Sequence, residues 1–128
     1  MARRAERRTD RARPARRSPC PVACTLDLLG DRWTLLVVRD LFAGKTHYGE
    51  FLASPEGIAT NILAARLAML QEAGIVRASP SPVREGASRY ELTARGRSLR
   101  PVLRAVAQWG LEHLPGTQAR IAFLPEVE

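Results

Sequence analysis

Residues 46–73, THYGEFLASPEGIATNILAARLAMLQEA, decide the fold. They predict a short helix that contains Tyr48 and that ends where the segment Ser54-Pro55-Glu56-Gly57 favours a turn. A longer helix is expected from about Ala59 to Ala73, and Gly74 supplies the glycine on which helices commonly end. Two helices joined by a turn that contains glycine are typical of a helix-turn-helix unit.

A β-hairpin is predicted directly after this unit. Residues 75–79 and 88–92 are short segments in which apolar and polar side chains partly alternate, as in strands with one buried face. The intervening residues 80–87 contain two prolines and the pair Glu85-Gly86, which favour a loop. A hairpin in this place corresponds to the wing of a winged helix.

Two further helices are predicted before residue 46. Pro21 suits the first turn of one helix, and Gly30 is expected to end it. Asp31 is expected to cap the next helix, from Arg32 to Ala43. This second helix is apolar on nearly all sides, so it is predicted to be the central, buried one.

A last long helix is expected from Ala94 to Leu114, capped by Thr93 and kinked by Pro101. The fold class predicted from all these elements is mainly α with a small β-hairpin (α+β), arranged as a winged helix-turn-helix.

Composition divides the chain into three parts. Residues 1–19 lack apolar periodicity and carry eight arginines against two acidic residues, so a disordered basic arm is predicted. Residues 20–114 form the predicted DNA-binding and dimerisation domain, and residues 115–128 a C-terminal tail. Most of the net charge of +7 falls in the arm, which makes the total charge weak evidence for a nucleic-acid partner.

Several classes of protein find little support in the sequence. No stretch reaches the roughly 20 apolar residues of a membrane span, and no signal peptide is recognisable, so a cytoplasmic protein is expected. Cys20, Cys24, His47 and His113 lack metal-ligand spacing, so neither a metal nor a cofactor is predicted. A hydrolase would need Cys20 or a serine as nucleophile and a histidine as base, but neither histidine lies in a catalytic motif. The chain is therefore predicted not to be an enzyme.

The predicted helix over residues 59–73 has two different faces. At about 100° per residue, Leu63, Leu67 and Leu70 fall on one side. The opposite side carries only small or polar residues, namely Thr60, Asn61, Ala64, Ala65 and Ala68. A slim face of this kind suits a major groove about 12 Å wide.

Base contacts are expected from Thr60, Asn61 and Ala64, because the first residues of a recognition helix lie nearest the base edges. An asparagine pairs with adenine through two hydrogen bonds, and an alanine methyl contacts the methyl group of thymine. The alternative is that the alanines serve only as helix formers and that Asn61 serves as a capping residue.

Positive charge is concentrated between Lys45 and Arg104, where nine basic residues face five acidic ones. The candidates for phosphate contacts are Lys45, Arg66, Arg84 and Arg89, followed by Arg77 and Arg95. Arg66 projects to the middle of the apolar face, so its alternative role is structural, with an apolar stem that covers its neighbours and a carboxylate partner.

Several motifs occur in a fixed order along the chain. They are Cys20-Pro21-Val22, LLGDRWTLL at 28–36, GIATNIL at 57–63, Arg66-Leu67, Leu70, EAGIV at 72–76 and YELTARG at 90–96. In this order they resemble the HxlR family of bacterial transcriptional regulators over about residues 20–114. The resemblance implies a winged-helix regulator that binds a pseudo-palindromic DNA operator as a homodimer. In that family the first and last helices form the dimer interface, which implies interface roles for Leu26, Leu103, Val106 and Trp109.

The resemblance also implies a sensor, because some members of the family respond to oxidants or electrophiles through a cysteine at the position of Cys20. The dipole of a helix N-terminus favours the reactive thiolate. A disulfide to Cys24, one turn further along the same helix, would be strained, so a bridge between subunits is favoured. The alternatives are a packing role for Cys20, control by a non-covalent apolar ligand, and a winged-helix module that binds protein without DNA.

Overall fold

The computed structural model describes residues 17–118. The chain divides after Asp31 into two compact units, and each is described by itself. The predicted basic arm up to residue 16 and the predicted tail from residue 119 lie outside the described residues. Between residues 17 and 118, no helix is long and apolar enough to cross a bilayer, and no three potential metal-binding side chains cluster.

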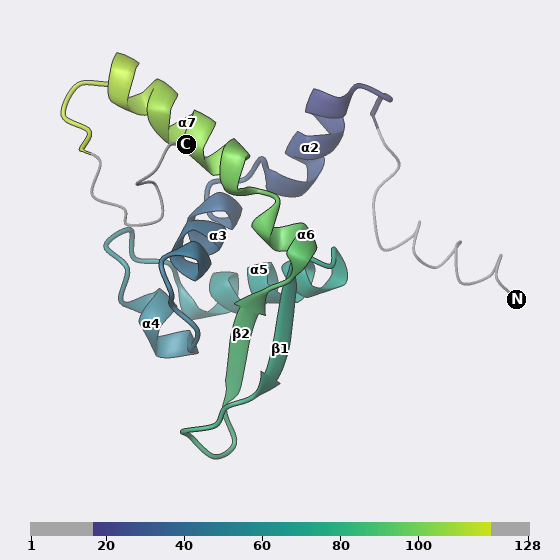
Figure 1. The fold of residues 1–128 in the computed structure, drawn as a ribbon, viewed down its shortest axis with the longest axis vertical. Helices are drawn as coiled ribbons and strands as arrows, with labels where there is room; N and C mark the ends of the chain where they lie inside the picture. The colour runs from purple at the N-terminus through teal and green to yellow at the C-terminus, as the bar shows by residue number, and fades with distance from the viewer. Residues whose placement is uncertain (1–16, 119–128) are drawn as a thin grey trace, which may run out of the picture. The chain divides into compact units, whose positions relative to one another are not determined.

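The first unit contains helix α2 (Pro21–Leu29), drawn in purple in Figure 1. Pro21 occupies its first turn and Gly30 ends it, as the sequence predicts. The segment before the helix is held by Arg17, whose Nε donates a hydrogen bond of 2.9 Å to the Asp27 carboxylate.

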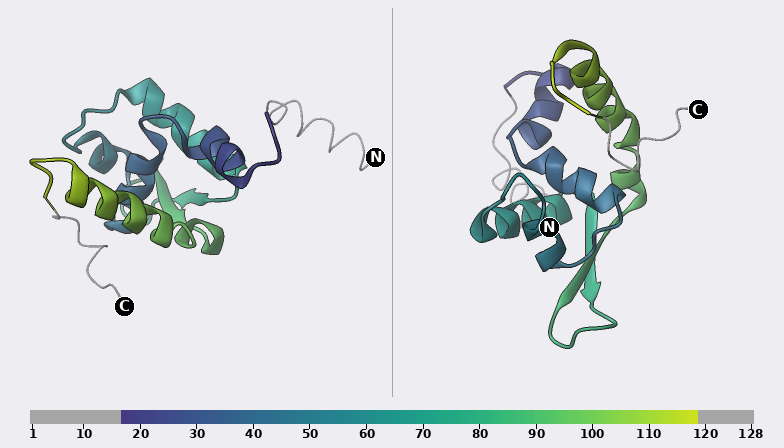
Figure 2. Two further views of the ribbon diagram at one scale, coloured as in Figure 1. Left: turned by 90° about the horizontal axis from the view of Figure 1, so that it is seen from above. Right: turned by 90° about the vertical axis from the view of Figure 1, so that its left-hand side faces the viewer.

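The second unit is a winged helix (Figures 1 and 2). It consists of α3 (Thr34–Phe42), α4 (Tyr48–Leu52), α5 (Thr60–Glu72), β1 (Val76–Pro80), β2 (Ser88–Leu92), α6 (Ala94–Arg97) and α7 (Arg100–His113). Helices α3 and α4 both contact α5, and the strands form an antiparallel hairpin that extends away from these helices. The predicted fold class is therefore confirmed.

The core of this unit uses the apolar face that the sequence predicts for α5. Leu63, Leu67 and Leu70 are 0%, 2% and 0% exposed, which turns the opposite face of the helix outward. The other buried apolar side chains are Val37, Val38, Leu41, Phe51, Ile58, Ile75, Val76, Leu92 and Leu103.

Helix α3 differs from its prediction in two ways. It begins at Thr34, and its N-cap is Trp33 instead of Asp31, because residues 31–33 form a turn in place of the first helical residues. The helix is also not lined by apolar residues alone, since its buried positions include Asp40. This buried carboxylate has a specific set of partners.

The predicted last helix is divided in two. Thr93 caps α6 as expected, because its Oγ1 accepts a hydrogen bond of 3.0 Å from Gly96 N. Instead of kinking at Pro101, the helix breaks after Arg97 and restarts at Arg100, which places Pro101 in the first turn of α7. Proline is tolerated there because the first N–H groups of a helix have no partner within the helix.

The hairpin is anchored along the segment that leads into α4. Val76 pairs with Leu92 and Pro80 with Ser88 at the two ends of the ladder. On the other side of β2, Tyr90 N donates a hydrogen bond of 2.8 Å to the carbonyl oxygen of Thr46. The middle of β2 is thus fixed to the segment that leads into the helix-turn-helix.

Candidate nucleic-acid interface

The outward face of α5 carries the residues predicted to contact bases. Thr60, Asn61 and Ala64 are all exposed. The N-cap of the helix is Ala59, so Asn61 lies inside the first turn. The alternative role of Asn61 as the capping residue is therefore wrong, because Ala59 holds that position and no side chain makes a capping hydrogen bond to α5.

A second helix fixes the start of α5. The hydroxyl of Tyr48, on α4, donates a hydrogen bond of 2.9 Å to the carbonyl oxygen of Thr60. Burial raises the pKa of Tyr48, so the phenol stays a neutral donor over the physiological range. The end of α5 that carries Thr60 and Asn61 is thus held against α4.

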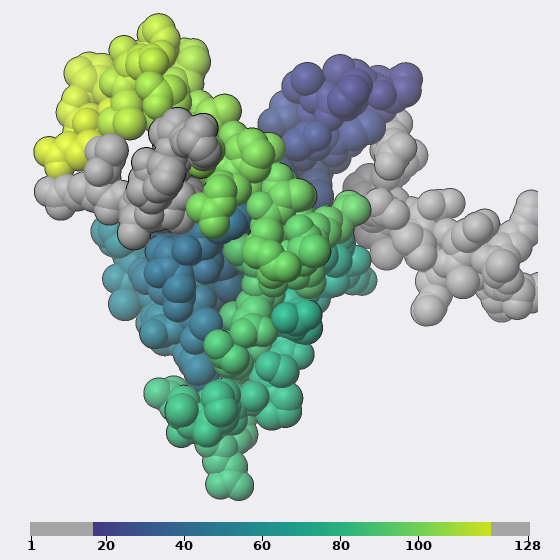
Figure 3. Space-filling model, viewed as in Figure 1, coloured from purple at the N-terminus to yellow at the C-terminus, as the bar shows by residue number. Residues whose placement is uncertain are grey.

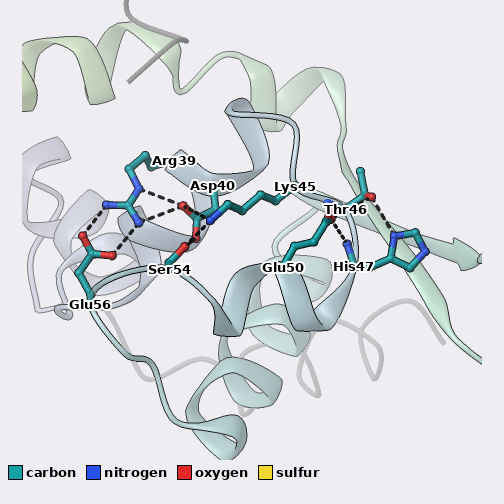
Figure 4. A network of polar contacts seen from close by, with 8 residues as sticks. All are labelled: Arg39, Asp40, Lys45, Thr46, His47, Glu50, Ser54 and Glu56. Carbon is teal, nitrogen blue, oxygen red and sulfur yellow. Dashed lines mark hydrogen bonds and ion pairs between the residues drawn. The ribbon is translucent and has the colours of Figure 1, made fainter. Parts of the chain in front are cut away.

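A buried polar network joins α3 to the turn before α5 (Figure 4). Asp40, whose side chain is 8% exposed, accepts hydrogen bonds from Ser54 Oγ at 2.6 Å and from Arg39 Nη2 at 2.9 Å. Arg39 also binds both carboxylate oxygens of Glu56, each at 2.8 Å. Because Ser54 and Glu56 lie between α4 and α5, the network sets the direction in which the chain enters α5.

Lys45 belongs to the same network. Its Nζ donates a hydrogen bond of 2.6 Å to Ser54 Oγ and lies 3.9 Å from the Asp40 carboxylate. Its ammonium group is therefore held inside the helix-turn-helix, and a phosphate contact from Lys45 stays a prediction. The sequence did not predict this network. The charged pair Arg39-Asp40, in an otherwise apolar helix, was the signal that could have indicated it.

Two carboxylates beside the helix-turn-helix have a lowered pKa. The hydrogen bonds from Arg39 lower the pKa of Glu56, and the backbone N–H groups of Thr46 and His47 lower that of Glu50. A carboxylate with a lower pKa in the folded state stabilises the fold above its unfolded pKa. Both carboxylates therefore stabilise the fold at neutral pH. In acid, this stabilisation is lost as the pH falls through the pKa that each carboxylate has in the folded protein.

The wing carries two of the predicted phosphate contacts. Arg84 is exposed in the loop between the strands, which forms the narrow tip in Figure 3. Arg89 lies on β2, where it forms an ion pair of 3.1 Å with Glu91, and Arg77 pairs with the same carboxylate at 3.3 Å. Arg66, on α5, is half-buried.

Helix α7 exposes an apolar face. Val102, Val106 and Trp109 lie on this face and are 36%, 55% and 58% exposed. Leu103, predicted to lie on a dimer interface, is 6% exposed and belongs to the core of the second unit, and its interface role stays a prediction. In the first unit, Leu26 of α2 is 53% exposed.

The two cysteines lie at the start of α2. Cys20 is its N-cap and is exposed. Cys24 is half-buried, and its Sγ donates a hydrogen bond of 3.3 Å to the carbonyl oxygen of Ser18. Arg17, three residues before Cys20, forms an ion pair of 2.7 Å with Asp27.

Comparisons with known proteins agree with this geometry. A family model for HxlR-like helix-turn-helix proteins matches residues 28–118. An uncharacterised HTH-type transcriptional regulator of Synechocystis sp. is 38% identical over 95 residues, which make up 74% of this chain and 70% of the relative. Related regulators of Mycobacterium bovis and Mycobacterium tuberculosis are longer, and the match spans 59% of their length.

Two solved structures resemble the fold closely. The crystal structure of PA1607, a candidate transcription factor, has a TM-score of 0.72 at 45% identity and covers 80% of this chain and 72% of that one. The reduced form of the redox regulator HypR has a TM-score of 0.68 at 28% identity and covers 75% of this chain and 95% of that one.

Proposed function

The chain belongs to the HxlR-like helix-turn-helix family of transcriptional regulators, and we propose that it binds a pseudo-palindromic DNA operator as a homodimer. The observation that carries this proposal is the exposed, slim face of α5, which begins with Thr60 and Asn61. Helix α5 enters the major groove, and its first turn reads base edges. Arg84 and Arg89 of the wing contact the phosphate backbone or the minor groove.

The cations near α5 have supporting roles in this proposal. Arg66 is half-buried on α5 and reaches a phosphate beside the groove, with its stem against the apolar side chains. Lys45 acts mainly through Ser54, to which its ammonium group is bound. Phosphate contacts fix the orientation of the protein on DNA, and the base contacts supply the specificity.

Asn61→Ala tests base recognition. On an operator selected from random duplexes, we expect affinity to fall roughly 10- to 100-fold, the value of one bidentate contact to a base. Binding to an unrelated duplex should change little, because phosphate contacts are unaffected. Fluorescence anisotropy with both duplexes measures the difference.

Gln71→Ala, an exposed position near the other end of α5, is the matched control. Equal losses on both duplexes would contradict a role for Asn61 in specificity.

Dimerisation would use α7 of both protomers together with α2. The exposed apolar side chains of Val106 and Trp109 on α7, and of Leu26 on α2, support this proposal. A two-fold dimer presents the same patch from both subunits and places two recognition helices about one turn of DNA apart.

The regulatory signal is proposed to be an oxidant or electrophile that reacts with Cys20. Two observations support the proposal: Cys20 is exposed at the N-terminus of a helix, and one structural neighbour is named a redox regulator. Oxidation joins the Cys20 sulfurs of two subunits, with the oxidant accepting two electrons and two protons leaving the thiols. The bridge then alters the spacing of the recognition helices.

A thiol oxidant such as diamide tests this signal. Wild-type protein is expected to change its operator affinity several-fold on oxidation and to recover it with a reductant. Cys20→Ser should bind DNA with the same affinity before and after treatment, whereas Cys24→Ser should still respond. Anisotropy titrations, combined with non-reducing gels, report affinity and cross-linking. If the wild-type protein and Cys20→Ser respond alike, Cys20 is not the sensor.

Control by a non-covalent apolar ligand is the alternative. A cavity lined by Trp33, Val37, Phe51 and Ile58 has a volume of about 10 Å³, which is room for one water molecule. An apolar ligand does not fit this cavity unless the side chains around it move.

A further inference from the structure

His47 connects the first turn of α4 to the loop of the wing. Its Nε2 lies 2.7 Å from Ser81 Oγ, and its Nδ1 lies 2.9 Å from Thr46 Oγ1. On the other side, Glu50 accepts hydrogen bonds from the backbone N–H groups of Thr46 at 2.8 Å and His47 at 3.0 Å (Figure 4). The imidazole is thus held from the α4 side and reaches across 34 positions of sequence to the wing.

The hydrogen bonds of Ser81 limit how it can bond to His47. Ser81 Oγ accepts from Val83 N at 3.1 Å and from Arg84 N at 3.0 Å, which orders the loop that carries Arg84. A serine oxygen has two lone pairs and one O–H, so with both lone pairs used its O–H donates to His47 Nε2. In the tautomer that fits this bond, Nδ1 carries the proton and donates it to Thr46 Oγ1.

We infer that His47 is a positioning residue, which places the wing loop and Arg84 relative to the recognition helix. The inference rests on the proposed DNA binding. The bond from Tyr90 N to Thr46 fixes the middle of β2, whereas Ser81 follows the last residue of β1, so His47 holds the loop beyond the strands. A wing fixed in advance loses less conformational entropy when it contacts DNA.

Hydrogen exchange on the DNA-free protein tests the link directly. His47→Ala is expected to raise the exchange rate of the amides of Val83 and Arg84 roughly 3- to 10-fold, the effect of one lost hydrogen bond. His47→Gln, whose amide oxygen replaces the acceptor Nε2, should restore slow exchange. Amides in α5, such as that of Leu67, serve as an internal control. Unchanged exchange in His47→Ala would overturn the inference, whether or not the protein binds DNA.

Operator binding supplies the second measurement. His47→Ala should bind the operator roughly 3- to 10-fold more weakly than the wild type. The slope of log affinity against log salt concentration should also be smaller by about 1, because one phosphate contact is no longer held. His47→Gln should bind the operator like the wild type. A His47→Gln variant that binds as weakly as His47→Ala would overturn the inference. A wild-type protein that binds no operator would instead overturn the proposed function, which the exchange experiment does not depend on.

Discussion

Asp40→Ala is expected to lower the free energy of unfolding by about 3–5 kcal/mol, because it removes one partner of a buried ion pair. The side chain of Asp40 is 8% exposed, and it accepts hydrogen bonds from Arg39 and Ser54. Without it, Arg39 keeps its ion pair with Glu56 but loses the one with Asp40, and the Ser54 hydroxyl loses its acceptor. Urea denaturation measures the difference, at one protein concentration for all variants, since the proposed dimerisation would add to stability.

Glu56→Ala is the matched control for this prediction. It removes the other carboxylate from Arg39, but the Glu56 side chain is 36% exposed, so water replaces the lost contact. We expect a loss of about 1 kcal/mol or less, as for other exposed ion pairs. If both variants lose the same stability, burial of Asp40 is not what makes the network important.

The elements of the helix-turn-helix could be predicted because their signals are local. Gly74 has a positive φ of 77°, which is favourable for glycine, and it ends α5 as expected. The leucines at helical spacing identify the buried face of α5 without any tertiary information. The outward face, with Thr60 and Asn61, follows from the same periodicity.

The supporting contacts could not be predicted, because they join residues that are distant in sequence. Asp40 and Ser54 are 14 positions apart, and His47 and Ser81 are 34 positions apart. Polar residues at such distances give no periodic signal. For the same reason, Lys45 was predicted from its charge as a phosphate contact, whereas its ammonium group points to Ser54.

Val106→Asp is expected to convert the protein into a monomer and to weaken operator binding by more than about 100-fold. In a two-fold dimer the same patch meets itself, so one substitution places two carboxylates in the apolar contact. Val106 is 55% exposed on α7, beside Trp109, which is 58% exposed, so the protomer should still fold. A monomer binds each half-site independently and loses the effective concentration that links the two sites, which contributes 10²–10⁴-fold in linked binders.

Gln108→Asp is the matched control, because it adds the same charge to α7 at an exposed position on the other side of the helix. Analytical ultracentrifugation gives the mass of each variant, circular dichroism its helix content, and anisotropy its affinity for the operator. We expect Gln108→Asp to stay dimeric and to bind DNA like the wild type. A Val106→Asp variant that sediments as a dimer would place the interface elsewhere. A monomer that keeps full operator affinity would show that the two recognition helices act separately, because the dimer is needed only if both half-sites are read at once.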